Sequence, residues 1–243
     1  MKGVILGINP AVQIVDLSHE VERHDALEAA LVLEAAVAFF PGGTVHLAVV
    51  DPGVGGARRG LVITAGRDRF VGPDNGVFTP LLLGERWEAF ELSATEYRLS
   101  DVSPTFHGRD VFAPAAAHLA LGVGPDRFGR PVHDPVRLPW PAASRTAAGI
   151  AGEVVHVDRF GNLVTSICRR DLPPDAIVQV AGRSVPVART YGDVAAGELI
   201  GLVGSSGRLE VAVCEGDASR VLDVGRGAFV LAVSSSSRSS PKK

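Results

Sequence analysis

The chain has 243 residues, of which 46% are hydrophobic and 21% are charged. That is enough apolar material for one large domain or two small ones, and it places the chain outside the disordered class. Its 24 basic and 27 acidic residues give a formal net charge of −3, and the basic residues are scattered along the chain. A nucleic-acid partner is not expected, because a phosphate backbone is bound by a concentrated positive field.

The sequence indicates a soluble protein of a reducing compartment. Its longest apolar stretch, residues 26–40, is shorter than the ~20 residues that a membrane span requires, and it contains two glutamates. The N-terminus lacks the basic-then-apolar plan of a signal peptide. Cys168 and Cys214 form neither a disulfide framework nor a paired metal-binding spacing. We therefore expect a cytoplasmic protein that binds neither membrane nor metal.

The first half of the chain has the pattern of an α/β domain. Two β-rich runs, 13–17 and 44–50, flank a helix expected at 25–40, which the Pro-Gly-Gly at 41–43 ends. The run 44–50 is almost continuously hydrophobic, as is typical of a strand covered by helices on both faces. Further elements are expected in chain order, namely strands at 61–64 and 69–71 and an alanine-rich helix at 108–122. This pattern predicts a doubly wound N-terminal domain over residues 1–138.

A proline-rich stretch, 130–141, followed by small residues through 149, predicts a domain boundary. Beyond it, short β-rich runs separated by turn residues predict a small C-terminal β-domain over residues 148–233, with strands at 153–157, 163–167, 177–180, 209–213 and 229–233. The last ten residues, 234–243, are serine-rich and cannot bury enough apolar surface to offset their ordering entropy. We expect them to form a disordered tail.

The first candidate site is a glycine-rich loop at 51–59. Asp51 directly follows the buried run 44–50, and ligands of open α/β sheets bind at the carboxyl ends of strands. The glycines that follow allow a sharp turn and a close backbone approach to a small molecule, with Arg58 and Arg59 within reach of the same pocket. A tight turn, with the arginines in solvent, explains this short motif equally well.

The second candidate site opens the helix expected at 108–122. His107 lies where free backbone N–H groups and the helix dipole favour anions and polar ligands. For Arg109 and Asp110 a structural role is the favoured interpretation, with Asp110 capping the helix and Arg109 pairing with a carboxylate. A metal site built from Asp51, His107 and Asp110 has no supporting ligand pattern.

Three further polar motifs are compatible with turns. Residues 73–76 combine Pro, Asp, Asn and Gly, and residues 205–210 fit a turn that leads into a strand. Residues 158–162, Asp-Arg-Phe-Gly-Asn, fit a hairpin turn, although an aromatic side chain flanked by Asp and Asn could also hold a polar ligand. No phosphate-binding loop, nucleophile elbow or dinucleotide-binding fingerprint is present in the sequence.

Taken together and in order, five motifs resemble one family, the S-adenosyl-L-methionine hydrolases, also called S-adenosyl-L-methionine hydroxide adenosyltransferases. The halogenating enzymes that use the same substrate are related to it. The motifs are Phe39-Phe40-Pro41, Val49-Val50-Asp51-Pro52-Gly53-Val54-Gly55, Pro73-Asp74-Asn75-Gly76, Phe106-His107-Gly108-Arg109-Asp110-Val111-Phe112-Ala113-Pro114 and Asp158-Arg159-Phe160-Gly161-Asn162. The likeness covers nearly the whole chain up to the serine-rich tail.

The resemblance implies an N-terminal α/β domain, a barrel-like C-terminal β-domain and a homotrimer whose active sites lie between neighbouring subunits. It implies hydrolysis of S-adenosyl-L-methionine to adenosine and L-methionine, without a cofactor. It also implies an Asp, Arg, His set that handles the attacking water, and the matching residues here are Asp51, Arg58 and His107. Because the halogenating relatives lack that set, the hydrolase is favoured over the halogenase.

The resemblance further implies which C-terminal residues bind the substrate. Asp158 and Asn162 would hold the methionine or ribose portion, and Phe160 would pack beside the ligand. The rest of the pocket would be lined, partly through backbone atoms, by Ser206, Glu210 and Ala212.

In one respect the sequence departs from the family pattern. The resemblance calls for an earlier strand and a Thr-Asp-Phe-Gly loop whose aspartate holds the ribose hydroxyls, whereas Met1 matches the middle of that pattern. We expect that a start codon assigned too late accounts for this. Two alternatives follow, a halogenase that uses the same substrate and a weakly catalytic adenosine-binding protein.

Overall fold

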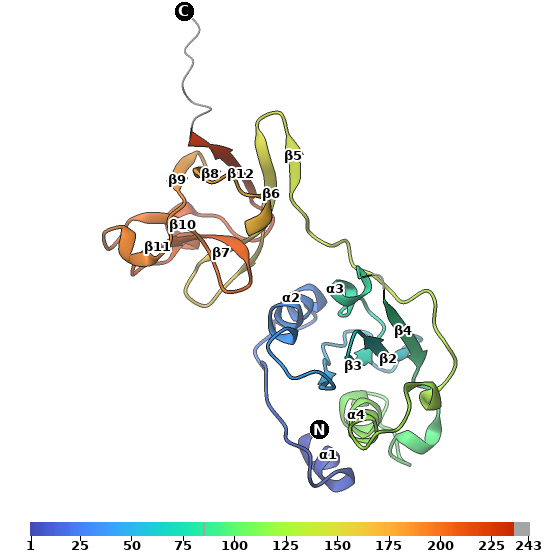
Figure 1. The fold of residues 1–243 in the computed structure, drawn as a ribbon. Helices are drawn as coiled ribbons and strands as arrows, with labels where there is room; N and C mark the ends of the chain where they lie inside the picture. Colours follow the sequence, from blue (N-terminus) through green and yellow to red (C-terminus); the bar gives the residue numbers. More distant parts are fainter. Residues whose placement is uncertain (85, 236–243) are drawn as a thin grey trace, which may run out of the picture. The chain divides into compact units, whose positions relative to one another are not determined.

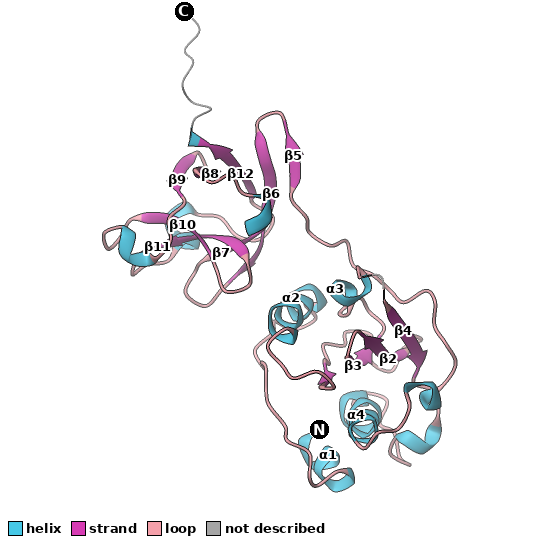
Figure 2. Cartoon of the chain, in the orientation of Figure 1, coloured by secondary structure: helices cyan, strands magenta, loops and turns pink. Residues whose placement is uncertain are grey.

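A computed structural model describes residues 1–84 and 86–235. It divides into two compact units, Met1–Trp140 and a second that begins at Pro141. The division falls inside the proline-rich stretch at 130–141. Figure 1 follows the chain from one unit into the other, and Figure 2 marks the helices and strands of each.

The N-terminal unit is built on a four-stranded sheet with the order β1-β3-β2-β4. Strands β1 and β3 are parallel, and the remaining pairs are antiparallel. The strands are β1 (Val45–Leu47), β2 (Gly60–Ala65), β3 (Asp68–Pro73) and β4 (Trp87–Glu91). The helices are α1 (Lys2–Ile8), α2 (Ala26–Val37), α3 (Thr79–Leu82) and α4 (Ala113–Ala120), with a π-helical turn at Gly108–Phe112 and 3₁₀ turns at Thr95–Tyr97 and Pro125–Phe128.

Both faces of this sheet are buried. Alternate residues of a strand point to opposite faces, and on this sheet each face packs into a core of its own. Leu61 and Ile63 of β2 belong to a core that includes Leu33 of α2. Val62, between them, belongs to a second core with Ala115 of α4. Figure 1 shows α2 and α3 on one side of the sheet and α4 on the other. The predicted α/β class is confirmed.

The strand predicted at 13–17 is wrong. No strand pairs with this segment in the described chain, and β1 covers only residues 45–47 of the predicted run 44–50. An apolar alternation becomes a strand only where a neighbour completes its hydrogen-bond ladder. Here residues 13–17 instead border a cavity of about 500 Å³, which residues 45–47 line as well.

The C-terminal unit contains an eight-stranded antiparallel sheet with the order β10-β11-β7-β6-β12-β8-β9, while β5 pairs with β6. A bridge between Val187 and Gly201 brings its two ends together, so the sheet is nearly closed and the predicted barrel-like domain is confirmed. Its strands are β5 (Ser144–Thr146), β6 (Gly149–Val157), β7 (Leu163–Cys168), β8 (Ala176–Val180), β9 (Arg183–Pro186), β10 (Leu199–Val203), β11 (Arg208–Val213) and β12 (Phe229–Ser234). Helix α5 (Ala218–Leu222) follows β11.

The predicted disordered tail begins too early. Ser234 is the last residue of β12 and pairs with Ala176 of β8. Its hydroxyl donates to Asp175 at 2.8 Å, and the Ser235 amide donates to the Asp175 carbonyl at 3.1 Å. These bonds order two serines that have no apolar surface to bury. The remainder of the predicted tail, 236–243, lies outside the described residues.

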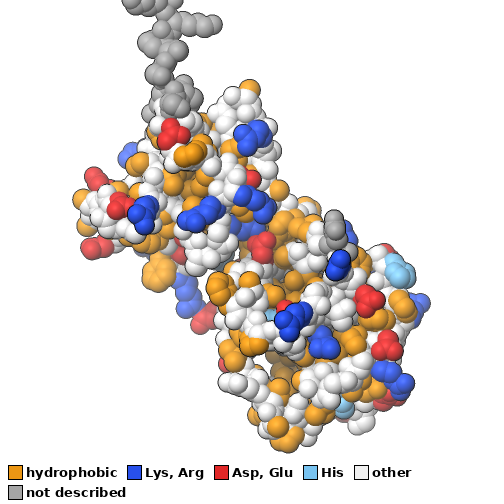
Figure 3. Space-filling view, viewed as in Figure 1, with side chains coloured by type: hydrophobic (Ala, Val, Ile, Leu, Met, Phe, Trp, Pro, Cys, Tyr) orange, Lys and Arg blue, Asp and Glu red, His pale blue; other side chains and the backbone are white. Residues whose placement is uncertain are grey.

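The surface of each unit is mixed in charge. Figure 3 shows basic and acidic side chains interspersed on the visible face of each, with hydrophobic side chains among them. Among the residues that the structure covers, no helix has both the length and the apolar character needed to cross a bilayer.

Candidate active site

Two loops that are distant in sequence meet on the N-terminal unit. One runs from Asp51, after β1, to Arg58, and the other leads through Pro104 to His107. Gly55 has a φ of +77°, and a Cβ there would lie 2.3 Å from the Pro104 carbonyl oxygen. Only glycine fits both that backbone conformation and that contact. The glycine-rich sequence therefore allows the two loops to touch.

The contact between the loops brings Asp51, Arg58 and His107 together. Arg58 Nε donates to Asp51 Oδ1 at 2.9 Å and to Oδ2 at 3.1 Å, and Arg58 Nη2 donates to Oδ2 as well. The same Nη2 lies 2.8 Å from His107 Nδ1. The side chains of Arg58 and Asp51 are only 13% and 6% exposed, so the ion pair is largely shielded from water.

The contact with Arg58 sets the protonation of His107. A guanidinium can only donate, so Nδ1 accepts and the remaining ring proton of a neutral imidazole is on Nε2. Burial, and next the positive charge of Arg58, lower the pKa of His107 below its usual 6.5. His107 is therefore neutral at pH 7 and presents an N–H donor at Nε2.

Arg58 also rests on an aromatic side chain that the sequence analysis did not single out. The guanidinium carbon lies 5.1 Å from the ring centroid of Phe112, which is fully buried. Phe112 is five residues after His107 and ends the π-helical turn that His107 precedes. In the sequence, only its place in the Phe-His-Gly-Arg-Asp-Val-Phe motif could have indicated that Phe112 lies at the site.

Arg59 does not share the pocket of Arg58, contrary to the expectation from the sequence. Its Nε donates to Asp74 at 2.8 Å, and its Nη1 donates to Asp134 at 2.8 Å. Asp74 in turn accepts from the Val136 amide at 2.7 Å. Adjacent residues of an extended segment point in opposite directions, so one arginine enters the Asp51 cluster and the other fastens residues 134–136.

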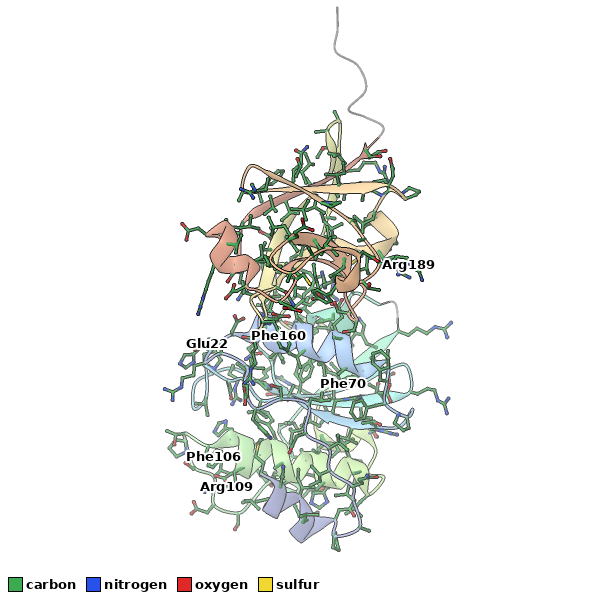
Figure 4. All side chains as sticks on the ribbon, turned by 90° about the vertical axis from the view of Figure 1, so that its left-hand side faces the viewer. Glu22, Phe70, Phe106, Arg109, Phe160 and Arg189 are labelled. Atoms are coloured by element: carbon green, nitrogen blue, oxygen red, sulfur yellow. The ribbon has the colours of Figure 1, made fainter. Side chains whose placement is uncertain are left out.

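Arg109 and Asp110 form the pair expected of structural residues, but Asp110 does not cap the helix. Its carboxylate is fully buried and accepts from Arg109 Nε at 2.6 Å and from the Ser103 amide at 2.9 Å. The hydrogen bond from Arg109 is the main reason why the pKa of Asp110 is lowered. Arg109 also lies over the ring of Phe106 at 4.9 Å, and Figure 4 shows the two side by side.

The helix expected at 108–122 begins as a π-helical turn for a reason that lies in the sequence. Pro114 has no N–H, so it cannot donate to the carbonyl of Asp110 as a regular helix would require. The Leu99 amide donates to that carbonyl instead, at 2.9 Å. The wider turn ends at Phe112, after which α4 is regular.

The predicted substrate-binding residues of the C-terminal unit fall into two groups. Asp158 closes the β6–β7 turn by accepting from the Phe160 amide at 2.8 Å and the Asn162 amide at 2.9 Å. Asn162 is buried, and its amide nitrogen contacts both Asp158 Oδ2 at 2.9 Å and the Tyr191 hydroxyl at 3.2 Å. Phe160 is 78% exposed at the tip of the turn (Figure 4).

A cavity of about 530 Å³ lies beside this turn. It is lined by Phe160, Asn162, Tyr191, Val213, Glu215, Gly216 and Asp217. Ser206, Glu210 and Ala212 do not line it. Ser206 is exposed in the β10–β11 turn, and Ala212 is fully buried in a small core beneath β11. The sequence analysis missed Tyr191, which lies in a short 3₁₀ turn with no motif around it.

Glu210 is half-buried on β11. Its burial, and next the negative charge of Asp158, raise its pKa. Burial is also the main reason why the pKa of Tyr191 is raised, followed by the charge of Glu210. These three side chains therefore share one electrostatic environment.

Among the residues that the structure describes, no group of three or more His, Cys, Asp or Glu side chains could hold a metal ion. Asp51 and His107 face a guanidinium, whose charge disfavours a cation at the same place. Both cysteines, Cys168 and Cys214, are free thiols.

Comparison with known proteins assigns both halves of the chain to one family. Residues 1–129 match the model of the SAM hydroxide adenosyltransferase N-terminal domain, and residues 152–231 match that of its C-terminal domain. The chain therefore belongs to the SAM hydroxide adenosyltransferase family.

Its relatives share both sequence and fold. A protein of Thermus thermophilus named (R)-S-adenosyl-L-methionine hydrolase is 45% identical over 237 residues, covering 93% of this chain and 90% of the relative. A protein of Actinoplanes named fluorinase is 32% identical and covers 70% of this chain and 67% of the relative. The crystal structure of a conserved protein from Thermotoga maritima superposes with a TM-score of 0.87 at 38% identity, covering 96% of this chain and 93% of that one.

Proposed function

We propose that this protein hydrolyses S-adenosyl-L-methionine to adenosine and L-methionine. The observation that carries the proposal is the partly buried Asp51-Arg58-His107 cluster, in a chain whose relatives at 41–45% identity are named (R)-S-adenosyl-L-methionine hydrolase. A carboxylate and a neutral imidazole, joined by one guanidinium, are the groups that a hydrolase needs to activate a water molecule.

The proposed step is an in-line displacement at the ribose 5′ carbon. The oxygen of water forms a bond to that carbon while the carbon–sulfur bond breaks, and the electron pair of that bond leaves with sulfur as a neutral thioether. Because the leaving group is already a good one, alignment of oxygen, carbon and sulfur in a site that excludes bulk water supplies most of the acceleration. The step requires no cofactor.

Asp51 is the proposed acceptor of the proton that water loses. His107 already uses its Nδ1 lone pair to accept from Arg58, so its imidazole offers only the Nε2 proton to the water oxygen. A carboxylate has about four lone-pair sites, so Asp51 can receive a proton while it stays paired with Arg58. Arg58 orients both groups and stabilises negative charge that develops on the attacking oxygen.

The substrate-binding residues proposed on the C-terminal unit are Asp158, Phe160 and Asn162. Ser206, Glu210 and Ala212, which the sequence also predicts, lie outside the lining of the cavity beside them. The hydrogen bonds of Asp158 and Asn162 and the cavity beside them support the first three. We further propose a homotrimer in which the C-terminal unit of one subunit completes the active site of its neighbour. In this arrangement the N-terminal unit of a subunit receives its C-terminal substrate contacts from the neighbouring subunit.

The decisive experiment is incubation of the purified protein with each sulfonium epimer of S-adenosyl-L-methionine, followed by chromatography. Equal amounts of adenosine and methionine are expected, and the relatives' names favour the (R) epimer. Parallel reactions with chloride and fluoride test the halogenase alternative, which predicts a halogenated adenosine. Calorimetric binding of adenosine without release of methionine would contradict the proposed hydrolysis and support a binding protein.

A further inference from the structure

The Phe112 ring forms an apolar floor beneath the Arg58 guanidinium. The guanidinium carbon lies 5.1 Å from the ring centroid, and Phe112 is fully buried in a core that also contains Val62, Val71 and Phe128. The ring is thus held rigidly from below, while Arg58 covers it from above. A cation over an aromatic face is attracted by the quadrupole of the ring, and this attraction grows as water is removed.

The position of the ring is also fixed relative to the backbone that carries Arg58. A Cβ on Gly60, two residues after Arg58, would lie 2.9 Å from Phe112 Cε1 and 3.2 Å from Leu92 Cβ. Glycine at the start of β2 therefore lets the ring press against the strand. This packing fixes the ring relative to the strand that follows Arg58.

Arg58 is the residue through which Asp51 and His107 are joined. It donates to both Asp51 oxygens and to His107 Nδ1. An aromatic face has no lone pair to compete for these N–H groups, and it keeps water away from one side of the guanidinium. The ring therefore favours the one orientation in which the donors of Arg58 point at the carboxylate and the imidazole.

We propose that Phe112 is a positioning residue for the hydrolysis, which acts by holding Arg58 in the orientation that joins Asp51 to His107. This inference rests on the proposed function. Phe112 does not itself touch the reacting atoms in this account, so its replacement should change turnover and the ionisation of His107 more than substrate affinity.

The test compares Phe112→Leu with Phe128→Leu. Both phenylalanines are fully buried in the same core, but only Phe112 lies under Arg58. The two variants lose a similar apolar volume, so thermal melts are expected to shift alike. Phe112→Leu is expected to lower kcat roughly tenfold with a KM within about twofold of wild type, whereas Phe128→Leu keeps wild-type kcat.

A second readout follows His107 directly. Its charged neighbours are Arg58, Asp51, Asp110 and Arg98, and Arg58 is the one that Phe112 holds. When Arg58 is less well held, protonation of His107 becomes easier, so the NMR titration midpoint of its imidazole should move upward in Phe112→Leu and stay unchanged in Phe128→Leu. His107→Gln identifies the resonance.

Equal losses of kcat in the two leucine variants, or an unchanged His107 titration in Phe112→Leu, would overturn the inference. If Phe112→Leu does not fold, Phe112→Met fills more of the volume without an aromatic face and is expected to give the same shifts. The NMR titration needs no turnover. If the wild-type protein releases no adenosine, the proposed function is contradicted. The NMR titration of His107 would still show whether Phe112 holds Arg58 in place.

Discussion

At the scale of single residues, Arg58 determines what its neighbours can do. It uses its donors on Asp51 and His107 at once, and it is shielded from water on the side of Phe112. The imidazole is thereby kept neutral and oriented, and the carboxylate is held beside a permanent cation. Two predictions concern these residues individually.

Asp51→Asn is expected to reduce kcat by about 10²–10⁴, the range over which a positioned general base contributes to catalysis. The amide retains the shape of the side chain but cannot receive the proton. Adenosine affinity, measured by calorimetry, is expected to change little, because Asp51 has no proposed contact with the nucleoside. Equal losses in turnover and in adenosine binding would contradict the proposed role of Asp51.

The pH dependence of kcat is expected to have an acid limb below pH 6.5, because the pKa of His107 is lowered in the folded protein. As the pH falls through that pKa, Nδ1 gains a proton and can no longer accept from Arg58, so activity is lost on the acid side. Rates measured between pH 5 and 8 give the midpoint. His107→Gln, whose side-chain oxygen can still accept from Arg58, should remove this limb, and a limb that persists would assign the titration to another group.

At the scale of elements, the site depends on the meeting of two loops and on an irregular helix. The loop after β1 approaches residues 103–107 at Gly55, and the missing N–H of Pro114 widens the first turn of the following helix. That turn places His107 at its start and Phe112 at its end. The geometry of this turn therefore sets the distance between the His107 imidazole and the Phe112 ring.

Gly55→Ala is expected to lower kcat by more than about tenfold, because a Cβ 2.3 Å from the Pro104 carbonyl must push the two loops apart. Gly66→Ala is the matched control: Gly66 also has positive φ, +61°, but nothing lies within 4 Å of its added Cβ. Both variants carry the backbone strain of a non-glycine residue at positive φ, roughly 1 kcal/mol. Steady-state kinetics and thermal melts should separate them, and equal activities would show that the loop contact is not required.

At the scale of the whole molecule, each unit has a core of its own. The N-terminal unit, whose sheet is buried on both faces, carries Asp51, Arg58 and His107 on its loops, while the C-terminal unit carries Asp158 and Asn162 in its β6–β7 turn. The proposed catalytic residues and the proposed substrate-binding residues thus belong to separate units. This division gives the proposed trimer a direct test.

Asp51→Asn and Asn162→Ala, each expected to be nearly inactive alone, should recover activity when they are mixed, refolded together and assayed. If each site combines the N-terminal unit of one subunit with the C-terminal unit of its neighbour, random mixing leaves about one quarter of the sites intact. The recovered rate is therefore expected near a quarter of the wild-type rate. No recovery would indicate that each subunit supplies a complete site, and light scattering reports the oligomeric state in parallel.

The sequence by itself predicted the α/β class and a second β-domain, and its resemblance to one family implied the barrel-like form of that domain and the three residues of the partly buried cluster. These features depend on local signals: hydrophobic periodicity, turn residues, and short motifs in a fixed order. The same local signals misplaced a strand at 13–17, because a strand forms only where a neighbouring strand pairs with it. They also started the tail too early at Ser234, because that serine is ordered by strand pairing and by a hydrogen bond to Asp175, an acceptor that is distant in sequence.

Only the tertiary structure decided how the cluster is connected. Arg58 and Arg59 are neighbours in sequence, yet one reaches Asp51 and the other Asp74, and Phe112 became relevant only once its ring was seen beneath Arg58. Hydrogen bonds, ring contacts and the protonation of His107 depend on distances between residues that are far apart in the sequence, such as Arg58 and His107, which are 49 positions apart. Those distances are set by packing of the whole unit, which no local pattern contains.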